Sequence, residues 1–102
     1  MTHRTYASQA DEALRQATPS PDARAVLAKI AERLRTVRPG GVLEDSRRLA
    51  LILRYSIDQR PRDLDGAEEL ELEVRGYAPQ ILDEVTRGEY ALILDRAAGA
   101  RR

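Results

Sequence analysis

The chain has 102 residues, enough for one domain with a modest core, and its 17 basic side chains balance its 17 acidic ones. It contains no cysteine, which excludes a disulfide framework, a thiolate metal site and a cysteine nucleophile, and is compatible with the cytoplasm, where we expect the protein to act. It lacks an apolar run approaching the ~20 residues of a membrane span, so we expect no membrane contact.

The first two predicted elements are helices. A short docking helix is predicted over 8–17. Ser20 can cap a second helix that starts at Pro21, where the missing amide donor costs nothing. Apolar side chains then recur at helical spacing as far as Val37, after which a Pro-Gly-Gly turn ends the pattern. The sequence therefore predicts a helix over 21–37.

The segment 44–59 is compatible with two structures. Apolar residues at every second position from 49 to 57 are typical of a strand, whereas Leu49, Ile52, Leu53 and Ile57 share one helical face. The length of the segment and its content of Leu, Ala and Arg favour a helix. In that helix Leu51 falls outside the apolar face and is expected to be exposed.

A long helix is predicted over 66–87. Asp65 and Glu68 have the spacing of a capping box at its start. Residues 69–75 alternate as in a strand, but apolar residues remain in helical phase over a longer stretch, which favours the helix. Leu72 falls outside this apolar face and is expected to be exposed.

Glycine and proline shape the end of the chain. Gly76 and Pro79 lie on the outer face of the long helix, where we expect them to kink it rather than end it, and Gly88 is expected to stop it. A short last helix is predicted over 89–98.

These elements predict an all-α bundle of four or five helices forming a single domain over 1–102, with frayed ends at 1–6 and 99–102. The alternative fold is α+β, with strands near 49–57, 69–75 and 90–94.

No catalytic or metal site is predicted. His3 is the single histidine and has no cysteine, serine or carboxylate partner at a recognisable spacing. The acids between 63 and 73 lack the spacing of a calcium loop, and although Glu69 and Glu73 lie one helical turn apart, a solvated acidic face is the simpler interpretation. We expect a protein that is not an enzyme and binds no cofactor.

The charges are separated along the chain. Residues 24–54 carry eight basic side chains against three acidic ones, and residues 58–84 carry nine acidic side chains against three basic ones. Such blocks can be matched within the fold, between copies or by a partner. The pattern indicates binding rather than catalysis.

Nucleic acid is one anionic partner to consider. The predicted second and third helices, joined by a glycine turn, place Arg47 and Arg48 where a recognition helix offers side chains to the major groove. Further phosphate contacts would come from Arg35, Arg38 and Arg54. The balanced net charge and the neighbouring acidic block make this the second hypothesis.

One passage resembles a known family. Ile81-Leu82-Asp83-Glu84-Val85-Thr86-Arg87-Gly88-Glu89, followed by Ala91-Leu92-Ile93-Leu94, is similar to the helix, Gly-Glu, strand passage of Phd/YefM-type antitoxins. In that family the passage lies near the N-terminus and precedes a toxin-binding tail, whereas here it lies at the end of the sequence. The resemblance implies a small regulatory partner, and a small inhibitor or antitoxin is the third hypothesis.

The function predicted from these patterns is a small non-catalytic interaction or assembly subunit, which docks to another protein or to a second copy. Tyr77 is expected in the core, whereas Tyr90 fits a core or an interface equally well. The candidate interaction surface consists of Arg35, Arg38, Arg47, Arg48, Arg54, Leu51, Tyr55, Glu69, Leu72 and Glu73.

Overall fold

The computed structural model describes residues 18–99, which form four α-helices and no strand. The helices are α2 (Pro21–Thr36), α3 (Asp45–Gln59), α4 (Leu64–Tyr77) and α5 (Arg87–Ala97). The prediction of an all-α fold is confirmed, and the three segments considered as strands are helical instead. The helix predicted over 8–17 lies outside the described residues.

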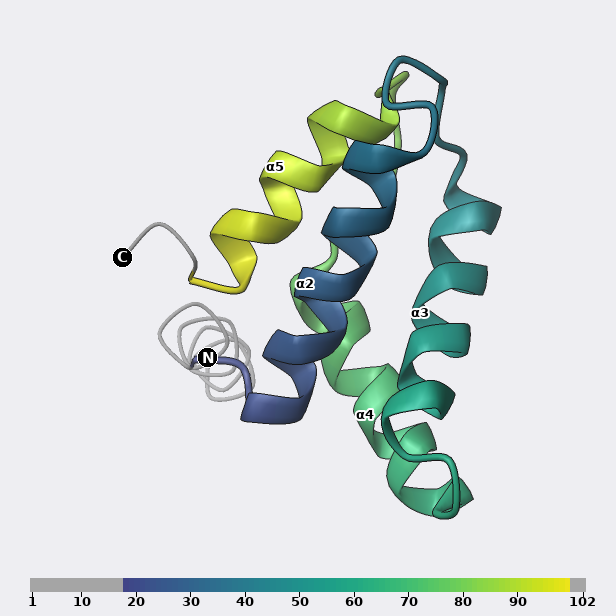
Figure 1. Ribbon diagram of the computed structural model, residues 1–102, viewed down its shortest axis with the longest axis vertical. Coiled ribbons are helices and arrows are strands. Elements are labelled where there is room, and N and C mark those ends of the chain that lie inside the picture. The colour runs from purple at the N-terminus through teal and green to yellow at the C-terminus, as the bar shows by residue number, and fades with distance from the viewer. Residues whose placement is uncertain (1–17, 100–102) are drawn as a thin grey trace, which may run out of the picture.

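Helix α2 is central and packs against the other three helices (Figure 1). The cap predicted at its start is confirmed, because the Ser20 hydroxyl accepts a hydrogen bond from the Ala23 amide at 3.1 Å. The same hydroxyl donates to Glu73 of α4 at 2.8 Å, which ties the two helices together. Burying each large aliphatic side chain contributes roughly 2 kcal/mol. The buried face of α2 consists of Ala23, Val26, Leu27, Ile30, Ala31 and Leu34.

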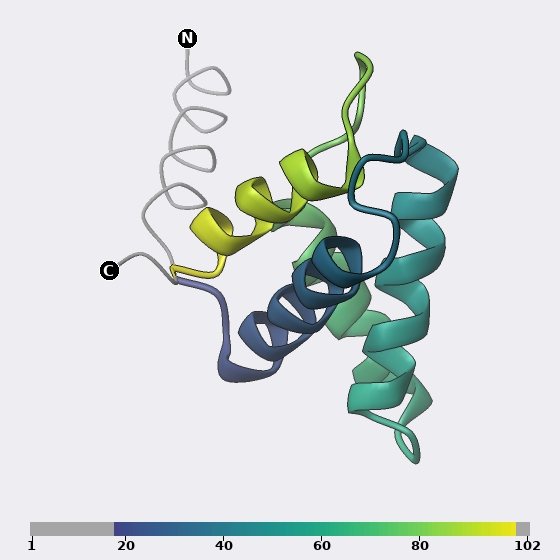
Figure 2. The ribbon, with the colours of Figure 1, turned by 45° about the horizontal axis from the view of Figure 1, so that its top comes forward.

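Helix α3 begins one residue after its predicted start, but its orientation differs from the prediction. Leu51, expected to be exposed, is buried with 7% of its surface accessible, while Leu53 and Ile57 are exposed. Both α2 and α4 pack against α3, and its buried face is rotated away from the expected apolar stripe to Arg48, Leu51, Ile52 and Ser56. Figure 2 shows α3 lying beside these two helices.

Helix α4 ends at Tyr77, so the prediction of one kinked helix over 66–87 is wrong. Ala78 adopts an extended conformation, with φ −108° and ψ 95°, which is favoured in a residue that precedes proline. Beyond the break Ile81 and Val85 still pack against the core, but from a loop rather than from a helix. Their helical spacing was therefore coincidental.

The start of α4 also differs from the prediction. The cap is Asp63, whose carboxylate accepts a hydrogen bond from the Gly66 amide at 2.9 Å, and the helix begins at Leu64. The capping box predicted from Asp65 and Glu68 is wrong by two residues. Tyr77, at the other end of α4, is half-buried and packs against the core, as expected.

Helix α5 begins where the long helix was predicted to stop. Thr86 and Glu89 form its capping box, with hydrogen bonds of 3.1 and 2.8 Å to each other's backbone amides. Gly88 lies within the first turn and donates to the carbonyl of Pro39 at 2.8 Å. A Cβ atom at Gly88 would lie 3.3 Å from that oxygen, so this close approach explains the glycine. The passage resembling the antitoxins is thus a loop followed by a helix.

Ser56 of α3 is fully buried, and its hydroxyl has no hydrogen-bond partner within residues 18–99. An unpaired buried hydroxyl costs about 1–3 kcal/mol. Ser56→Ala should therefore raise the free energy of unfolding by about 1 kcal/mol in urea titrations. Ser46→Ala, the same change at an exposed position of α3, should stay within about 0.5 kcal/mol of the parent. A loss of stability in Ser56→Ala would contradict the prediction.

Within the described part of the chain, no helix is long and apolar enough to cross a membrane.

Candidate anion-binding groove

A groove with a volume of about 530 Å³ lies between the end of α2, the loop that follows it and the first half of α3. These elements meet near the top of the molecule in Figure 1. We call it the arginine groove. Its other lining residues are uncharged apart from one acid, Glu44. The five arginines that line it are Arg33, Arg38, Arg47, Arg54 and Arg87.

Four different elements supply these arginines. Arg33 comes from the last turn of α2, and Arg87 is the first residue of α5. Arg47 and Arg54 are seven residues apart on α3, so they share one face and are separated by two turns, roughly 10 Å. Arg38 lies in the loop between α2 and α3. The groove is therefore a product of the tertiary fold rather than of one charged helix.

Hydrogen bonds fasten the loop that carries Arg38 to the start of α5, where Arg87 lies. The amide of Arg87 donates to the carbonyl of Gly41 at 2.8 Å, and the side-chain Nε of Arg87 donates to the carbonyl of Val37 at 2.7 Å. Arg38 has φ 50°, in the left-handed region that costs a non-glycine residue about 1 kcal/mol or more. These hydrogen bonds hold it there, so its position is fixed in advance of any binding.

Electrostatic repulsion is built into the groove. The pKa of Arg87 is lowered from its ordinary value, first by burial and then by the positive charges of Arg33, Arg38 and Arg47. Among the described residues, none of the five groove arginines forms an ion pair. Arg54 instead lies over the ring of Tyr55, 5.8 Å from its centroid. An anion in the groove would relieve this repulsion.

Two arginines predicted for the interaction surface lie elsewhere. Arg35 pairs with Asp95 of α5 at 2.6 Å and with Glu32 at 3.1 Å. Arg48 is buried, with 7% of its surface accessible, and its side chain bonds Asp45 at 2.7 Å and the carbonyl of Ala78 at 2.6 Å. Arg48 is a structural residue, and it cannot read bases from the first turn of α3 as the helix-turn-helix hypothesis required.

The remaining predicted residues fall into two places. Leu51 lines the groove from its buried position, and Tyr55 is half-buried beneath Arg54. Glu69 and Leu72 are exposed on α4. Glu73 is also on α4, but it accepts hydrogen bonds from the Ser20 amide and hydroxyl, each at 2.8 Å, and so contributes to packing.

Two of the five groove arginines were missing from the predicted surface. Arg33 could have been found, because it occupies the polar side of a well-predicted helix. Arg87 could not, because nothing in the sequence indicates that the start of α5 meets the end of α2.

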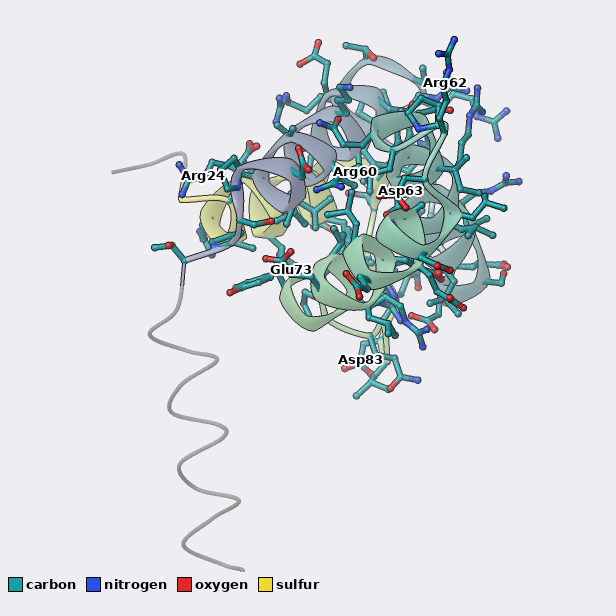
Figure 3. All side chains as sticks on the ribbon, turned by 90° about the horizontal axis from the view of Figure 1, so that it is seen from below. Arg24, Arg60, Arg62, Asp63, Glu73 and Asp83 are labelled. Atoms are coloured by element: carbon teal, nitrogen blue, oxygen red, sulfur yellow. The ribbon has the colours of Figure 1, made fainter. Side chains whose placement is uncertain are left out.

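The outer side of α4 carries the opposite charge. Exposed carboxylates of Asp65, Glu68 and Glu69 lie there. A smaller groove beside them is lined by the acids Asp65, Glu68 and Glu71 and by the exposed apolar residues Leu53, Ile57 and Leu64. Figure 3 shows this end of the molecule, where Arg60 pairs with Asp22 and Asp63.

Within residues 18–99, no group of three or more His, Cys, Asp or Glu side chains is placed to hold a metal ion. The chain matches no protein-family model, no curated protein and no solved structure.

Proposed function

We propose that this chain is a non-catalytic protein–protein interaction subunit acting in the cytoplasm, whose arginine groove docks an acidic surface of another protein or of a second copy. The observation that carries the proposal is the convergence of five arginines around one groove, none of which forms an ion pair with a carboxylate of residues 18–99. Planar guanidinium groups bind carboxylates in a bidentate manner, and complementary charge steers partners together.

The contrast with the paired arginines supports this role. Arg35, Arg48 and Arg60 each have an acidic partner inside the molecule. Among residues 18–99 the groove arginines have no such partner, which leaves their charge available to an external anion.

The proposal is tested by the binding of a fluorescent peptide of about ten glutamates, followed by anisotropy at low and high salt. Arg47→Glu/Arg54→Glu should weaken binding at least about tenfold, because two attractive charges become repulsive in a groove that salt screens only partly. Arg24→Glu/Arg62→Glu makes the same charge change at two exposed arginines outside the groove and should change affinity less than about twofold. Equal affinity of both double variants would overturn the proposal.

Nucleic acid is the alternative partner, because five converging arginines also suit successive phosphates. The acids on α4 and the buried position of Arg48 weigh against it. A short mixed-sequence duplex that competed with the glutamate peptide and bound more tightly would favour this alternative. A small inhibitor, the third hypothesis, would instead form a one-to-one complex with a larger protein and ignore the duplex.

A further inference from the structure

Helix α4 is acidic, so its charge is opposite to that of the arginine groove. It carries five acidic side chains and one basic one, whereas the groove is lined by five arginines and one glutamate. Asp65, Glu68 and Glu69 lie within about one turn and are exposed, and within residues 18–99 none of the three forms an ion pair. We call these three residues together with Leu72 the acidic ridge. Its charge complements that of the groove.

The spacing of the charged residues and the exposed apolar side chains also suit a contact between the two surfaces. One helical turn of α4 rises about 5 Å, which fits between Arg47 and Arg54, two turns apart on α3. Val42 at the groove is 55% exposed, and Leu72 on the ridge is 61% exposed. A convex helix placed against the groove would bring acids to arginines and cover both apolar side chains.

The contact cannot form within one molecule. The loop that follows α2 lies at the top of Figures 1 and 2, and the turn that leads into α4 lies at the bottom. Helix α3 separates them along a length of roughly 20 Å. The ridge of one copy can therefore reach only the groove of another.

We propose that the arginine groove receives the acidic ridge of a second copy, so that the chain assembles head to tail. This inference rests on the proposed function and names its partner. Because the two contacting surfaces differ, each added copy still presents one free groove and one free ridge. Assembly therefore continues beyond a dimer until it closes into a ring or is stopped by another acidic partner.

Two neutralised variants test this geometry. Arg47→Gln/Arg54→Gln impairs the groove and keeps the ridge, whereas Glu68→Gln/Glu69→Gln impairs the ridge and keeps the groove. All four positions are exposed, so both variants should fold. Native mass measurement of the parent should show oligomers at about 50 mM salt that dissociate at about 500 mM. Each variant alone should assemble at least about tenfold more weakly.

An equimolar mixture of the two variants gives the sharpest result. The intact groove of one variant should bind the intact ridge of the other, giving a dimer that contains one copy of each and grows no further. Arg24→Gln/Arg62→Gln, the matched control, should assemble like the parent. A parent that stays monomeric at low salt, or a mixture without the mixed dimer, would overturn the inference.

The outcomes separate this inference from the function on which it rests. If the parent is monomeric but its groove still binds the glutamate peptide, the second copy is the wrong partner and the proposed function stands. If the parent neither assembles nor binds the glutamate peptide, both the head-to-tail assembly and the proposed function are wrong.

Discussion

Replacing Arg48 with alanine should lower the free energy of unfolding by about 3 kcal/mol, the largest effect expected from exchanging any charged residue within 18–99. The guanidinium of Arg48 is buried and bonds both the Asp45 carboxylate and the backbone carbonyl of Ala78. Without the guanidinium, the carbonyl of buried Ala78 loses this donor, and the partly buried carboxylate of Asp45 loses its cation.

The loss should spread beyond one pair, because Asp45 also accepts a hydrogen bond from the Ile81 amide at 2.9 Å. Arg48 and Asp45 together fasten the loop after α4 to the first turn of α3. Urea unfolding measures the effect, and Arg47→Ala, the same change at the neighbouring exposed position, should stay within about 0.5 kcal/mol of the parent. Equal stabilities of the two variants would show that the buried network contributes nothing.

Stability measured at acidic pH should show the contribution of the same hydrogen bonds of Asp45 to Arg48 and Ile81. The pKa of Asp45 is lowered, first by the hydrogen bond from Arg48 and then by that from Ile81. A lowered pKa in the folded state means that Asp45 contributes stability above its ordinary value of 3.8, and that this stability is lost as pH falls through the lower folded value. Arg48→Ala removes the main cause of the shift, so the variant should lose less stability than the parent between neutral pH and acid.

Local signals in the sequence were sufficient to predict where α2 and α3 begin and end. Ser20 followed by Pro21 fixes a helix start through backbone chemistry alone, and the Pro-Gly-Gly turn ends that helix at nearly the predicted position. Which face of α3 is buried could not be predicted in the same way, because that face is determined by packing against α4 as well as against α2. Leu51 is buried for that reason, although it falls outside the apolar stripe.

The errors near the end of the chain have a different cause. The apolar residues keep their helical spacing across Pro79, but the residue before a proline disfavours the helical conformation. Gly88 is the type of residue that ends a helix, but Thr86 and Glu89 around it have the spacing of a capping box, which starts one. The local chemistry of proline and of the cap was the better guide here than periodicity. The meeting of Arg87 with the end of α2 arises only in the folded chain.

Replacing Tyr90 with phenylalanine should reverse the order of stability between neutral and alkaline solution. Tyr90 is 2% exposed, and its hydroxyl donates to the carbonyl of Pro79 at 2.6 Å. Near pH 8 the parent should be more stable than Tyr90→Phe by about 1 kcal/mol, the worth of that hydrogen bond. Burial, the main cause, raises the pKa of Tyr90 from 10.0 to about 12.

The raised pKa determines the sign of the alkaline effect. Between pH 10 and about 12 the unfolded chain releases the Tyr90 proton while the folded chain keeps it, so stability falls as pH rises. The loss approaches about 2 kcal/mol near pH 11.5, which exceeds the hydrogen bond, and Tyr90→Phe should then be the more stable protein by about 1 kcal/mol. Urea unfolding at the two pH values measures the reversal. Tyr55→Phe, which removes the hydroxyl group of a half-buried tyrosine, is the control. A Tyr90→Phe variant that stayed less stable than the parent at both values would show that Tyr90 ionises without resistance from the fold, and that the core around α5 is open to water.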